Sequence, residues 1–356
     1  MPERTPARPT RTVAAGRLRA LMESLLRAAG CDEEGARACA EVFLEADLRG
    51  VGGQGLDHMP TMLDNLRTGR TDPFGRPSLR AEGPAWAHVE GNKGPGQIAG
   101  RYAADLAAAK ARESGVAAVG VVNSGDLFMI GFYAERIARA GCVGLVFSDA
   151  PPLVHPQGGV ERALGTNPLA IAVPTSGPHP FLVDIATSAA SFSQIRLAAY
   201  HGESVAPNLG VDPEGRPSTE ATQIARGALS PLGGYKGFGL GLCVALLSGP
   251  LVGATTGKSL RAWHGDAASA PSKGHLVLAL NPAIFGGAER FRRVVSAYLD
   301  EVRYGRRADG VAEIRIPGER AFAARERSLE EGVRVYEAVW GKMAGWAEKL
   351  GVDMPD

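Results

Sequence analysis

The sequence has 356 residues, of which 45% are hydrophobic and 22% are charged. This composition is typical of a globular protein rather than a disordered one. The 39 basic and 38 acidic side chains give a formal net charge of +1, which argues against nucleic-acid binding because that function needs a strong basic field.

The chain is predicted to begin with two amphipathic helices within residues 13–48. Leu21 and Leu25 recur on one face of the first helix. Gly30 interrupts the pattern, so a second helix is expected to start shortly after it. A stretch that contains many glycines and prolines follows, with one short helical piece at residues 60–66.

Helices and strands then alternate along the centre of the chain. Gln97–Glu113 and Met129–Ala140 have a helical pattern, whereas Val116–Val122 and Val143–Phe147 are β-branched runs. Three further strands are predicted, at Leu169–Val173, Phe181–Ile185 and His275–Leu280. This order predicts an α/β architecture, in which a sheet is covered by helices.

The carboxyl end returns to helix, with apolar residues every four positions at Val335, Val339, Met343 and Ala347. Residues 1–85 and 286–356 are therefore predicted to pack together as a helical domain formed from both ends of the chain. Residues 86–285 form the predicted sheet domain.

Gly237–Gly257 contains no charged residue and has the length of a membrane span. It also holds six glycines and Pro250, and no other segment resembles a span. The composition therefore favours a helix that is buried closely against the sheet.

The four cysteines form no Cys-x-x-Cys pair, so neither a structural zinc site nor a disulfide framework is expected. Free thiols are typical of a cytoplasmic protein. No histidine pair has a spacing that indicates a metal site.

The chain lacks the dinucleotide fingerprint of a Rossmann fold. After Val116–Val122 it reads Asn123-Ser124-Gly125-Asp126, where G-x-G-x-x-G would be required. The later run Gly237-Phe238-Gly239-Leu240-Gly241 is a lone glycine cluster, and a close helix contact explains it as well as a phosphate does. A conventional Rossmann fold is therefore disfavoured.

Five other motifs stand in a fixed order along the chain: Ala46–Val51 with Gly55, Gly165–Ala170, Val183–Ser188, Pro231–Leu240 and Ile316–Glu319. In order and spacing they resemble the malate/L-lactate dehydrogenase family, which also contains ureidoglycolate, sulfolactate and cyclic-imino-acid oxidoreductases. The resemblance extends from about Val13 to the last helix.

This resemblance implies a non-Rossmann α/β fold with a central mixed sheet, a homodimer, and NADH or NADPH bound by the central domain. It implies that the helical domain serves the substrate and the dimer contact. The residues that it places at the cofactor or the cleft are Asn123, Thr166, Asn167, Asp184, Ala186, Lys236 and Gly237. A lysine followed by a glycine can present a cation and bare backbone amides to phosphate oxygens. From the residues alone, Lys236 capping a turn and Asp184 ending a strand explain those two positions equally well.

The chain departs from the family on the substrate side. The family's Asp-Ser-His-Gly motif, whose histidine is the proton donor, corresponds here to Gly52-Gly53-Gln54-Gly55. Glutamine forms hydrogen bonds but does not exchange a proton near neutral pH. His58 replaces a usual arginine, Met62 a frequent tyrosine, and Asp126 a second family histidine. The substrate pocket is thus rewritten more heavily than the cofactor side.

Three functions are compatible with this pattern. The first is hydride transfer to a substrate that needs no histidine acid, such as a protonated cyclic imine of specialised metabolism, with Gln54 orienting it. Asp126 and His58 are then candidates for any proton transfer. The second is a lyase, isomerase or cyclase that uses Asp126, His58 and Asp184 as acid and base. The third is a binding protein or pseudoenzyme, in which His58 is an exposed histidine at a helix start and Asp126 caps a helix. The retained cofactor motifs favour the first function, and the sequence does not distinguish NADH from NADPH.

Overall fold

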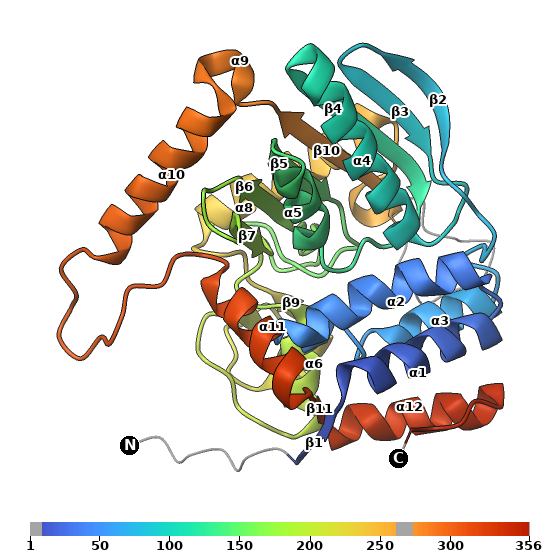
Figure 1. The fold of residues 1–356 in the computed structure, drawn as a ribbon. Helices are drawn as coiled ribbons and strands as arrows, with labels where there is room; N and C mark the ends of the chain where they lie inside the picture. Colours follow the sequence, from blue (N-terminus) through green and yellow to red (C-terminus); the bar gives the residue numbers. More distant parts are fainter. Residues whose placement is uncertain (1–8, 261–272, 356) are drawn as a thin grey trace. The chain divides into compact units, whose positions relative to one another are not determined.

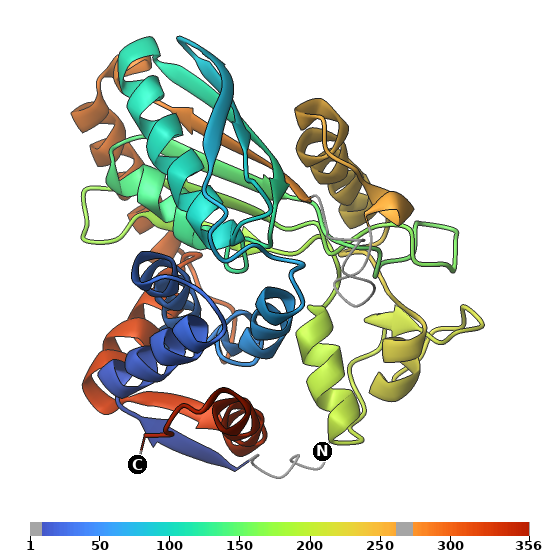
Figure 2. The same cartoon turned by 90° about the vertical axis from the view of Figure 1, so that its right-hand side faces the viewer.

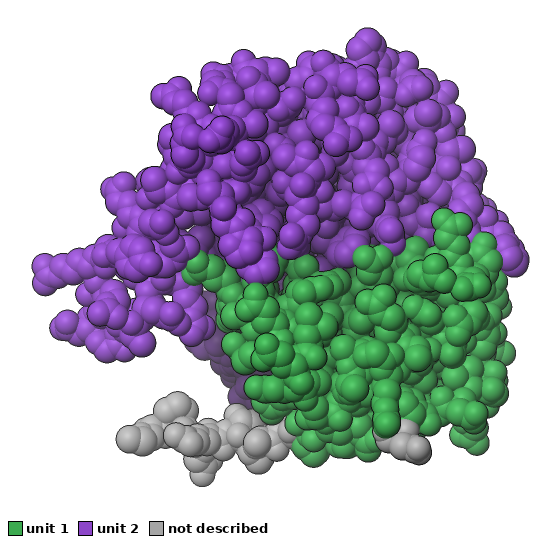
Figure 3. Space-filling model, viewed as in Figure 1, with its two compact units in different colours: residues 1–69, 319–356 green, residues 70–318 purple. Residues whose placement is uncertain are grey.

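The computed structural model describes residues 9–260 and 273–355 (Figure 1). The chain divides into two compact units, Met1–Gly69 with Glu319–Asp356 and Arg70–Gly318 (Figure 3). Both ends of the chain therefore share one unit, whose boundaries differ from the predicted ones near residues 85 and 286. The first unit is smaller than expected because strands β2 (Ser78–Gly83) and β3 (Trp86–Glu90) belong to the sheet of the second unit. Helix α10 (Ala288–Arg303) also belongs to the second unit.

The first unit consists of helices and one two-stranded sheet. Its elements are β1 (Thr10–Val13), α1 (Ala15–Ala28), α2 (Glu33–Leu48), the 3₁₀ turn η1 (Gly52–Gln54), α3 (Met59–Arg67), α11 (Glu319–Glu331), β11 (Val333–Tyr336) and α12 (Glu337–Leu350). Strand β1 pairs antiparallel with β11, which ties the beginning of the described chain to its end. The predicted helices at 13–48 are confirmed, with the break at Gly30.

The apolar periodicity of α1 explains how this unit is packed. Leu18, Leu21 and Leu25 are at most 3% exposed, and α1 packs against α2 and α12. The side chain of Asp32 caps α2 by accepting a hydrogen bond from the backbone N–H of Gly35 at 2.7 Å. Local capping and burial of one leucine stripe thus both favour the same arrangement.

The second unit is built around a seven-stranded mixed sheet. Its strands lie in the order β2 (Ser78–Gly83), β3 (Trp86–Glu90), β4 (Val116–Ser124), β10 (Lys273–Leu280), β5 (Val143–Ser148), β6 (Leu169–Val173) and β7 (Phe181–Ile185). Only the β3–β4 pair is parallel among these neighbours. The predicted α/β class with a central mixed sheet is confirmed, as are the five predicted strands.

Helices cover the two faces of this sheet. Helices α4 (Gly96–Ser114) and α5 (Gly131–Arg139) pack on one face, and α8 (Tyr235–Ser248) packs on the other. Figure 2 shows the sheet edge-on between α4 and α8. A smaller layer of α6 (Phe192–Tyr200), α7 (Ala221–Arg226), β8 (Gly210–Val211) and β9 (Ala228–Leu229) surrounds the buried side chains of Ile195, Ile224 and Leu229.

Helix α8 is the uncharged segment that the sequence predicted to be buried. Tyr235–Val252, which includes α8, passes the length and hydropathy test for a membrane span, but one such segment is weak evidence for a membrane protein. The prediction is right for one face of the helix, where Val244 and Ala245 are buried. On the other face Leu242 and Leu246 are 38% and 56% exposed, so α8 is only half covered within this unit.

Helix α10 (Ala288–Arg303) follows the short α9 (Ala283–Gly286) at the end of β10. It has no buried residue and extends away from the sheet (Figure 1). Val294, Tyr298 and Val302 recur every four residues and are 58%, 62% and 39% exposed. One side of α10 is therefore apolar and uncovered in this unit.

Candidate active site

Most of the residues that the sequence singled out lie along one edge of the seven-stranded sheet. The antiparallel pairings bring the carboxyl ends of β4, β5 and β7 to the same edge as the amino ends of β6 and β10. The residues at this edge are Asn123, Asp126, Asp149, Thr166, Asn167, Asp184, Ala186 and Lys273. Loops at strand ends are the usual location of ligand sites in α/β proteins.

Asn167 connects this edge to α8. Its side chain is fully buried and its φ of +35° lies in the left-handed region. The amide oxygen accepts a hydrogen bond from the N–H of Ala150 at 3.1 Å, and the amide nitrogen donates to the carbonyl of Gly241 at 2.9 Å. Asn167 therefore fixes the loop after β5 against the middle of α8.

The loop before β6 and the loop after β7 are also joined to each other. The hydroxyl of Thr187 donates to the carbonyl oxygens of Thr166 and Asn167 at 3.1 and 3.2 Å. The backbone N–H of Thr187 donates to Thr166 as well, at 2.9 Å. Thr166 and Ala186 are thereby held close together.

The start of α8 is packed too closely for any side chain at Gly237. A Cβ atom there would lie 2.3 Å from the carbonyl oxygen of Leu232 and 2.7 Å from that of Thr187. Lys236, the preceding residue, is exposed. The amino end of a helix carries a partial positive charge, which adds to the charge of Lys236 in favouring an anion. The prediction of a bare amide at Gly237 is wrong, because its N–H donates to the carbonyl oxygen of Leu232 at 2.8 Å.

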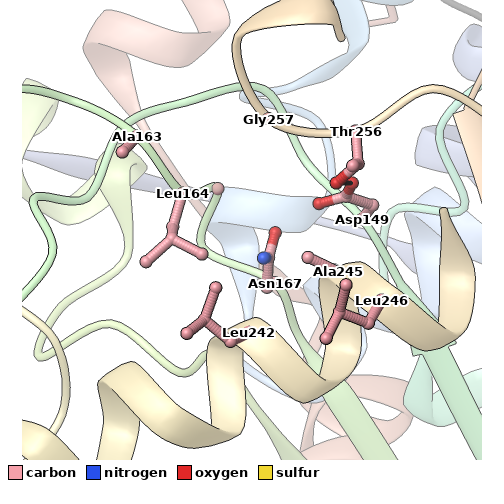
Figure 4. A pocket seen from close by; sticks show the side chains of 10 residues that line it. Asp149, Ala163, Leu164, Asn167, Leu242, Ala245, Leu246, Thr256 and Gly257 are labelled. Carbon is pink, nitrogen blue, oxygen red and sulfur yellow. Dashed lines mark hydrogen bonds between the residues drawn. The ribbon is translucent and has the colours of Figure 1, made fainter. Parts of the chain in front are cut away.

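A cavity of about 140 Å³ lies between α8 and the strand-end loops. Figure 4 shows the polar side chains of Asp149, Asn167 and Thr256 in its wall, opposite Leu242 and Leu246 of α8. A cavity of roughly 150 Å³ with apolar walls has room for a benzene-sized ring. The polar atoms of these three side chains bond to protein partners, so the cavity offers space for one small ring among mainly apolar groups.

Asp126 forms an ion pair that the sequence did not predict. Its Oδ2 lies 2.7 Å from Nζ of Lys273, whose side chain is 1% exposed, whereas the Asp126 side chain is 26% exposed. Its Oδ1 accepts a hydrogen bond from the N–H of Phe128 at 3.2 Å. The alternative in which Asp126 caps the following helix is wrong, because α5 begins at Gly131 without a side-chain cap.

His275 lies behind this pair and is fully buried. Its Nε2 lies 3.1 Å from the carbonyl oxygen of Gly125, and its Nδ1 lies 2.9 Å from the hydroxyl of Ser148. A carbonyl only accepts, so Nε2 carries the proton and Nδ1 accepts from Ser148. Burial, reinforced by the charge of Lys273, lowers the pKa of His275 to about 4. The imidazole is therefore neutral at physiological pH.

Asp149 is a second buried carboxyl group at this edge. It accepts hydrogen bonds from the hydroxyl of Thr256 and from the N–H of Ala150. Burial raises its pKa, and these two donors and the charge of Lys273 oppose the rise. Lys273 thus interacts electrostatically with carboxyl groups from two strand ends.

Asp184 contacts the start of α5. Its Oδ2 accepts a hydrogen bond from the N–H of Gly131 at 2.7 Å, the position where a helix favours a negative charge. A Cβ atom on Gly131 would lie 2.7 Å from the same oxygen. The side chain of Asp184 therefore has a structural partner, as one of the two sequence interpretations expected.

Gln54 and His58 belong to the first unit, and the other predicted site residues belong to the second. Gln54 ends the η1 turn, and Nδ1 of His58 lies 2.9 Å from the carbonyl oxygen of Gly53 in that turn. Asp47 accepts the N–H of Leu56 at 2.8 Å. Burial and then the nearby charge of Asp57 raise the pKa of Asp47 to about 8, against the effect of the Leu56 N–H. The chain just after the turn that carries Gln54 is thus fixed by the Asp47 carboxyl group, whose raised pKa favours the neutral form.

Sequence reasoning missed Lys273, His275, Asp149 and Thr256. The pairs that they form join residues more than a hundred positions apart, so no local pattern reveals them. The one available signal was a lysine two residues before the apolar run His275–Leu280. Among residues 9–260 and 273–355, no group of histidine, cysteine, aspartate and glutamate could hold a metal ion.

An α/β unit with polar strand-end loops around a ring-sized cavity is the arrangement of a small-molecule enzyme. Residues 13–344 match the family model described as malate/L-lactate dehydrogenase. A malate dehydrogenase from Pyrococcus abyssi is 33% identical over 331 residues, which cover 91% of this chain and 90% of the relative. A Δ1-pyrroline-2-carboxylate reductase from Pseudomonas fluorescens is 33% identical over 319 residues, with coverages of 89% and 93%.

The solved structures give the same result. The structure of a malate dehydrogenase from Pyrococcus horikoshii superposes with a TM-score of 0.89 at 30% identity, covering 97% of both chains. The chain belongs to the malate/L-lactate dehydrogenase family and is an oxidoreductase of that family. Dehydrogenases and reductases of this family use nicotinamide cofactors.

Proposed function

We propose that this chain is an NADH- or NADPH-dependent oxidoreductase with a rewritten substrate pocket, and that it reduces the C=N bond of a cyclic imine. The observation that carries the cofactor assignment is the cavity between α8 and the loops at Asn167 and Asp149. Its volume suits one aromatic ring, and α8 begins with an exposed lysine before a glycine that no Cβ could replace.

The residues in these positions fit a nicotinamide cofactor. Leu242 and Leu246 of α8 would pack against the ring, and Lys236 would bind the phosphates. The loops at Asn123, Thr166, Asp184 and Ala186 border the same sheet edge. When bound, the reduced cofactor supplies a hydride to the substrate carbon.

The imine assignment follows from the residue at position 54. Reduction of a ketone needs a proton for the new hydroxyl group, and general acid catalysis typically contributes about 10²–10⁴-fold to the rate. The amide of Gln54 has no proton to give near neutral pH. A protonated imine already carries its proton, so its reduction needs no acid at position 54.

Calorimetry with NADH and NADPH tests the cofactor assignment. We expect one of them to bind the purified protein, and Lys236→Ala to weaken that binding by on the order of tenfold, because a charge-assisted contact to phosphate is lost. The wild-type protein should then oxidise the bound cofactor faster with cyclic imines than with 2-oxo acids. Absence of binding by either nucleotide at millimolar concentration would exclude hydride transfer.

We also propose that the enzyme acts as a cytoplasmic homodimer. None of the four cysteines forms a disulfide in the described structure, which suits a reducing compartment. The apolar side of α10, with Val294, Tyr298 and Val302, is a surface that a second copy would cover. Sedimentation should give twice the mass of one chain, and Tyr298→Glu should shift the protein toward the monomer. A monomeric wild-type protein at micromolar concentration would contradict this.

A further inference from the structure

Lys273 and Asp126 connect the buried sheet to its accessible edge. Lys273 begins β10 opposite Ser124, the last residue of β4, and its side chain is almost completely buried. Asp126 follows β4 by two residues and keeps about a quarter of its side chain exposed. The 2.7 Å pair therefore places a buried positive charge directly behind a carboxylate that a ligand can reach.

The surroundings of Asp126 favour its ionised form. A buried ammonium group needs a counter-charge, since an unpaired charge in the protein interior is costly. The backbone at Asp126 is also fixed, because its carbonyl oxygen would lie 2.2 Å from a Cβ atom placed on Gly96 in the first turn of α4.

Two other titratable groups, His275 and Asp149, lie near the ion pair of Lys273 and Asp126. His275 is neutral. Its Nε2–H donates a hydrogen bond to the carbonyl oxygen of Gly125, the residue before Asp126. Asp149 interacts with Lys273 from the end of β5 and is bonded to Thr256. Lys273 therefore contacts Asp126 directly, and Asp126 presents oxygen atoms that accept hydrogen bonds.

An ionised carboxylate accepts hydrogen bonds and does not donate them. Beside it, a carbonyl oxygen that gains negative charge on reduction would be repelled, whereas an N–H that carries positive charge would be attracted. We infer that Asp126, held ionised by Lys273, binds the protonated nitrogen of the substrate and thereby selects cationic imines over carbonyl compounds. This inference rests on the proposed reduction of a C=N bond.

The reaction balances without a proton from the protein. The iminium carbon receives a hydride, the C=N double bond becomes a single bond, and the nitrogen becomes a neutral amine. The nicotinamide is left oxidised. Asp126 contacts the nitrogen throughout, and Lys273 acts only through Asp126, as a positioning residue.

The test compares kcat/KM for a cyclic imine and for a 2-oxo acid in four variants: Asp126→Asn, Lys273→Met, Lys273→Arg and the double variant Asp126→Asn/Lys273→Met. We expect Asp126→Asn and Lys273→Met to lower the imine value by on the order of 10- to 100-fold, mainly through KM, because a hydrogen bond to a charged group is lost. The 2-oxo acid value should not fall. Lys273→Arg should retain most of the preference for the imine, because it keeps a positive charge beside Asp126. The kcat/KM of the double variant for the imine should be no lower than that of Asp126→Asn alone.

Lys110→Met is the matched control. Lys110 forms an ion pair of the same 2.7 Å length, with Glu82, in the same unit, and its loss should leave the substrate preference unchanged. Thermal unfolding and cofactor binding, measured on every variant, identify any variant that has lost its fold. Asp126→Asn leaves the buried ammonium group of Lys273 without its counter-charge. The double variant removes both charges of the pair, so it tests the inference even if a single variant does not fold.

The outcomes separate this inference from the proposed function. If the wild-type protein reduces imines but Asp126→Asn keeps the same preference, the role of Asp126 is wrong and the proposed function stands. An equal loss for both substrates would also overturn it, as would a loss in Lys110→Met. A wild-type protein that binds the cofactor and reduces neither substrate would overturn both proposals.

Discussion

Gly237→Ala is expected to destabilise the protein by about 1–3 kcal/mol and to weaken nicotinamide cofactor binding by roughly tenfold or more. A Cβ atom at this position would lie 2.3 and 2.5 Å from the carbonyl oxygen and the nitrogen of Leu232, and 2.7 Å from the carbonyl oxygen of Thr187. All three are backbone atoms, so no rotamer change relieves the overlap. The first turn of α8 must move away from Thr187, which is also bonded to Thr166.

Gly239→Ala provides the matched control for this prediction. Gly239 lies in the same helix and has no atom within 4 Å of a Cβ placed on it. Alanine there should stabilise the protein by about 0.5–1 kcal/mol, because glycine is the poorer helix former, and cofactor binding should persist. Urea unfolding and nucleotide titration of both variants check the pair. Equal behaviour of the two variants would show that the close approach of α8 to Thr187 is unimportant.

Acidification is expected to destabilise the protein through His275. Its pKa is about 4 in the folded protein and close to the ordinary value of about 6.5 in the unfolded chain. Below pH 6.5 the unfolded chain therefore binds a proton that the folded protein refuses, so the free energy of unfolding decreases as the pH falls. Between pH 6.5 and pH 4 the loss from this residue is on the order of 3 kcal/mol.

A comparison of the wild-type protein with His275→Gln isolates this effect. Glutamine can still donate to the carbonyl of Gly125 and accept from Ser148, but it does not titrate. Carboxyl groups elsewhere contribute similarly to both proteins, so the difference between their unfolding free energies at pH 7, 6, 5 and 4.5 reports His275. We expect the wild-type protein to lose more stability than the variant as the pH falls. If the unfolding free energies of the two proteins fell in parallel with pH, the pKa of His275 would not be lowered in the folded protein.

The elements that sequence reasoning predicted are those whose burial alternates or repeats locally. Leu169–Val173 and Phe181–Ile185 are strands with the predicted bounds, because short β-branched runs suit a half-buried pleated surface. Strand β2, in contrast, was missed. Its first five residues are exposed, so no apolar alternation marks it, and it is a strand because it pairs with β3.

The candidate site shows a similar limit. The motifs at Thr166, Asp184 and Lys236 could be placed from the sequence, since each is a short pattern in a fixed order. The long-range contacts of the site could not be predicted, because Asn167 bonds to Gly241 and Asp126 to Lys273 across long stretches of chain. Such contacts depend on strand order, and in this sheet β10 inserts between β4 and β5. Nothing in the local sequence of β10 specifies that insertion.

The pairing of β1 with β11 has a consequence for how the protein is made. Residues 70–318 are synthesised between the two segments of the first unit, so α1 and α2 leave the ribosome long before β11 and α12 exist. Until β11 and α12 have been made, β1 lacks its partner strand and α1 lacks its contact with α12. Ribosome stalling shortly before Val333 should therefore yield nascent chains with a protease-sensitive amino-terminal segment.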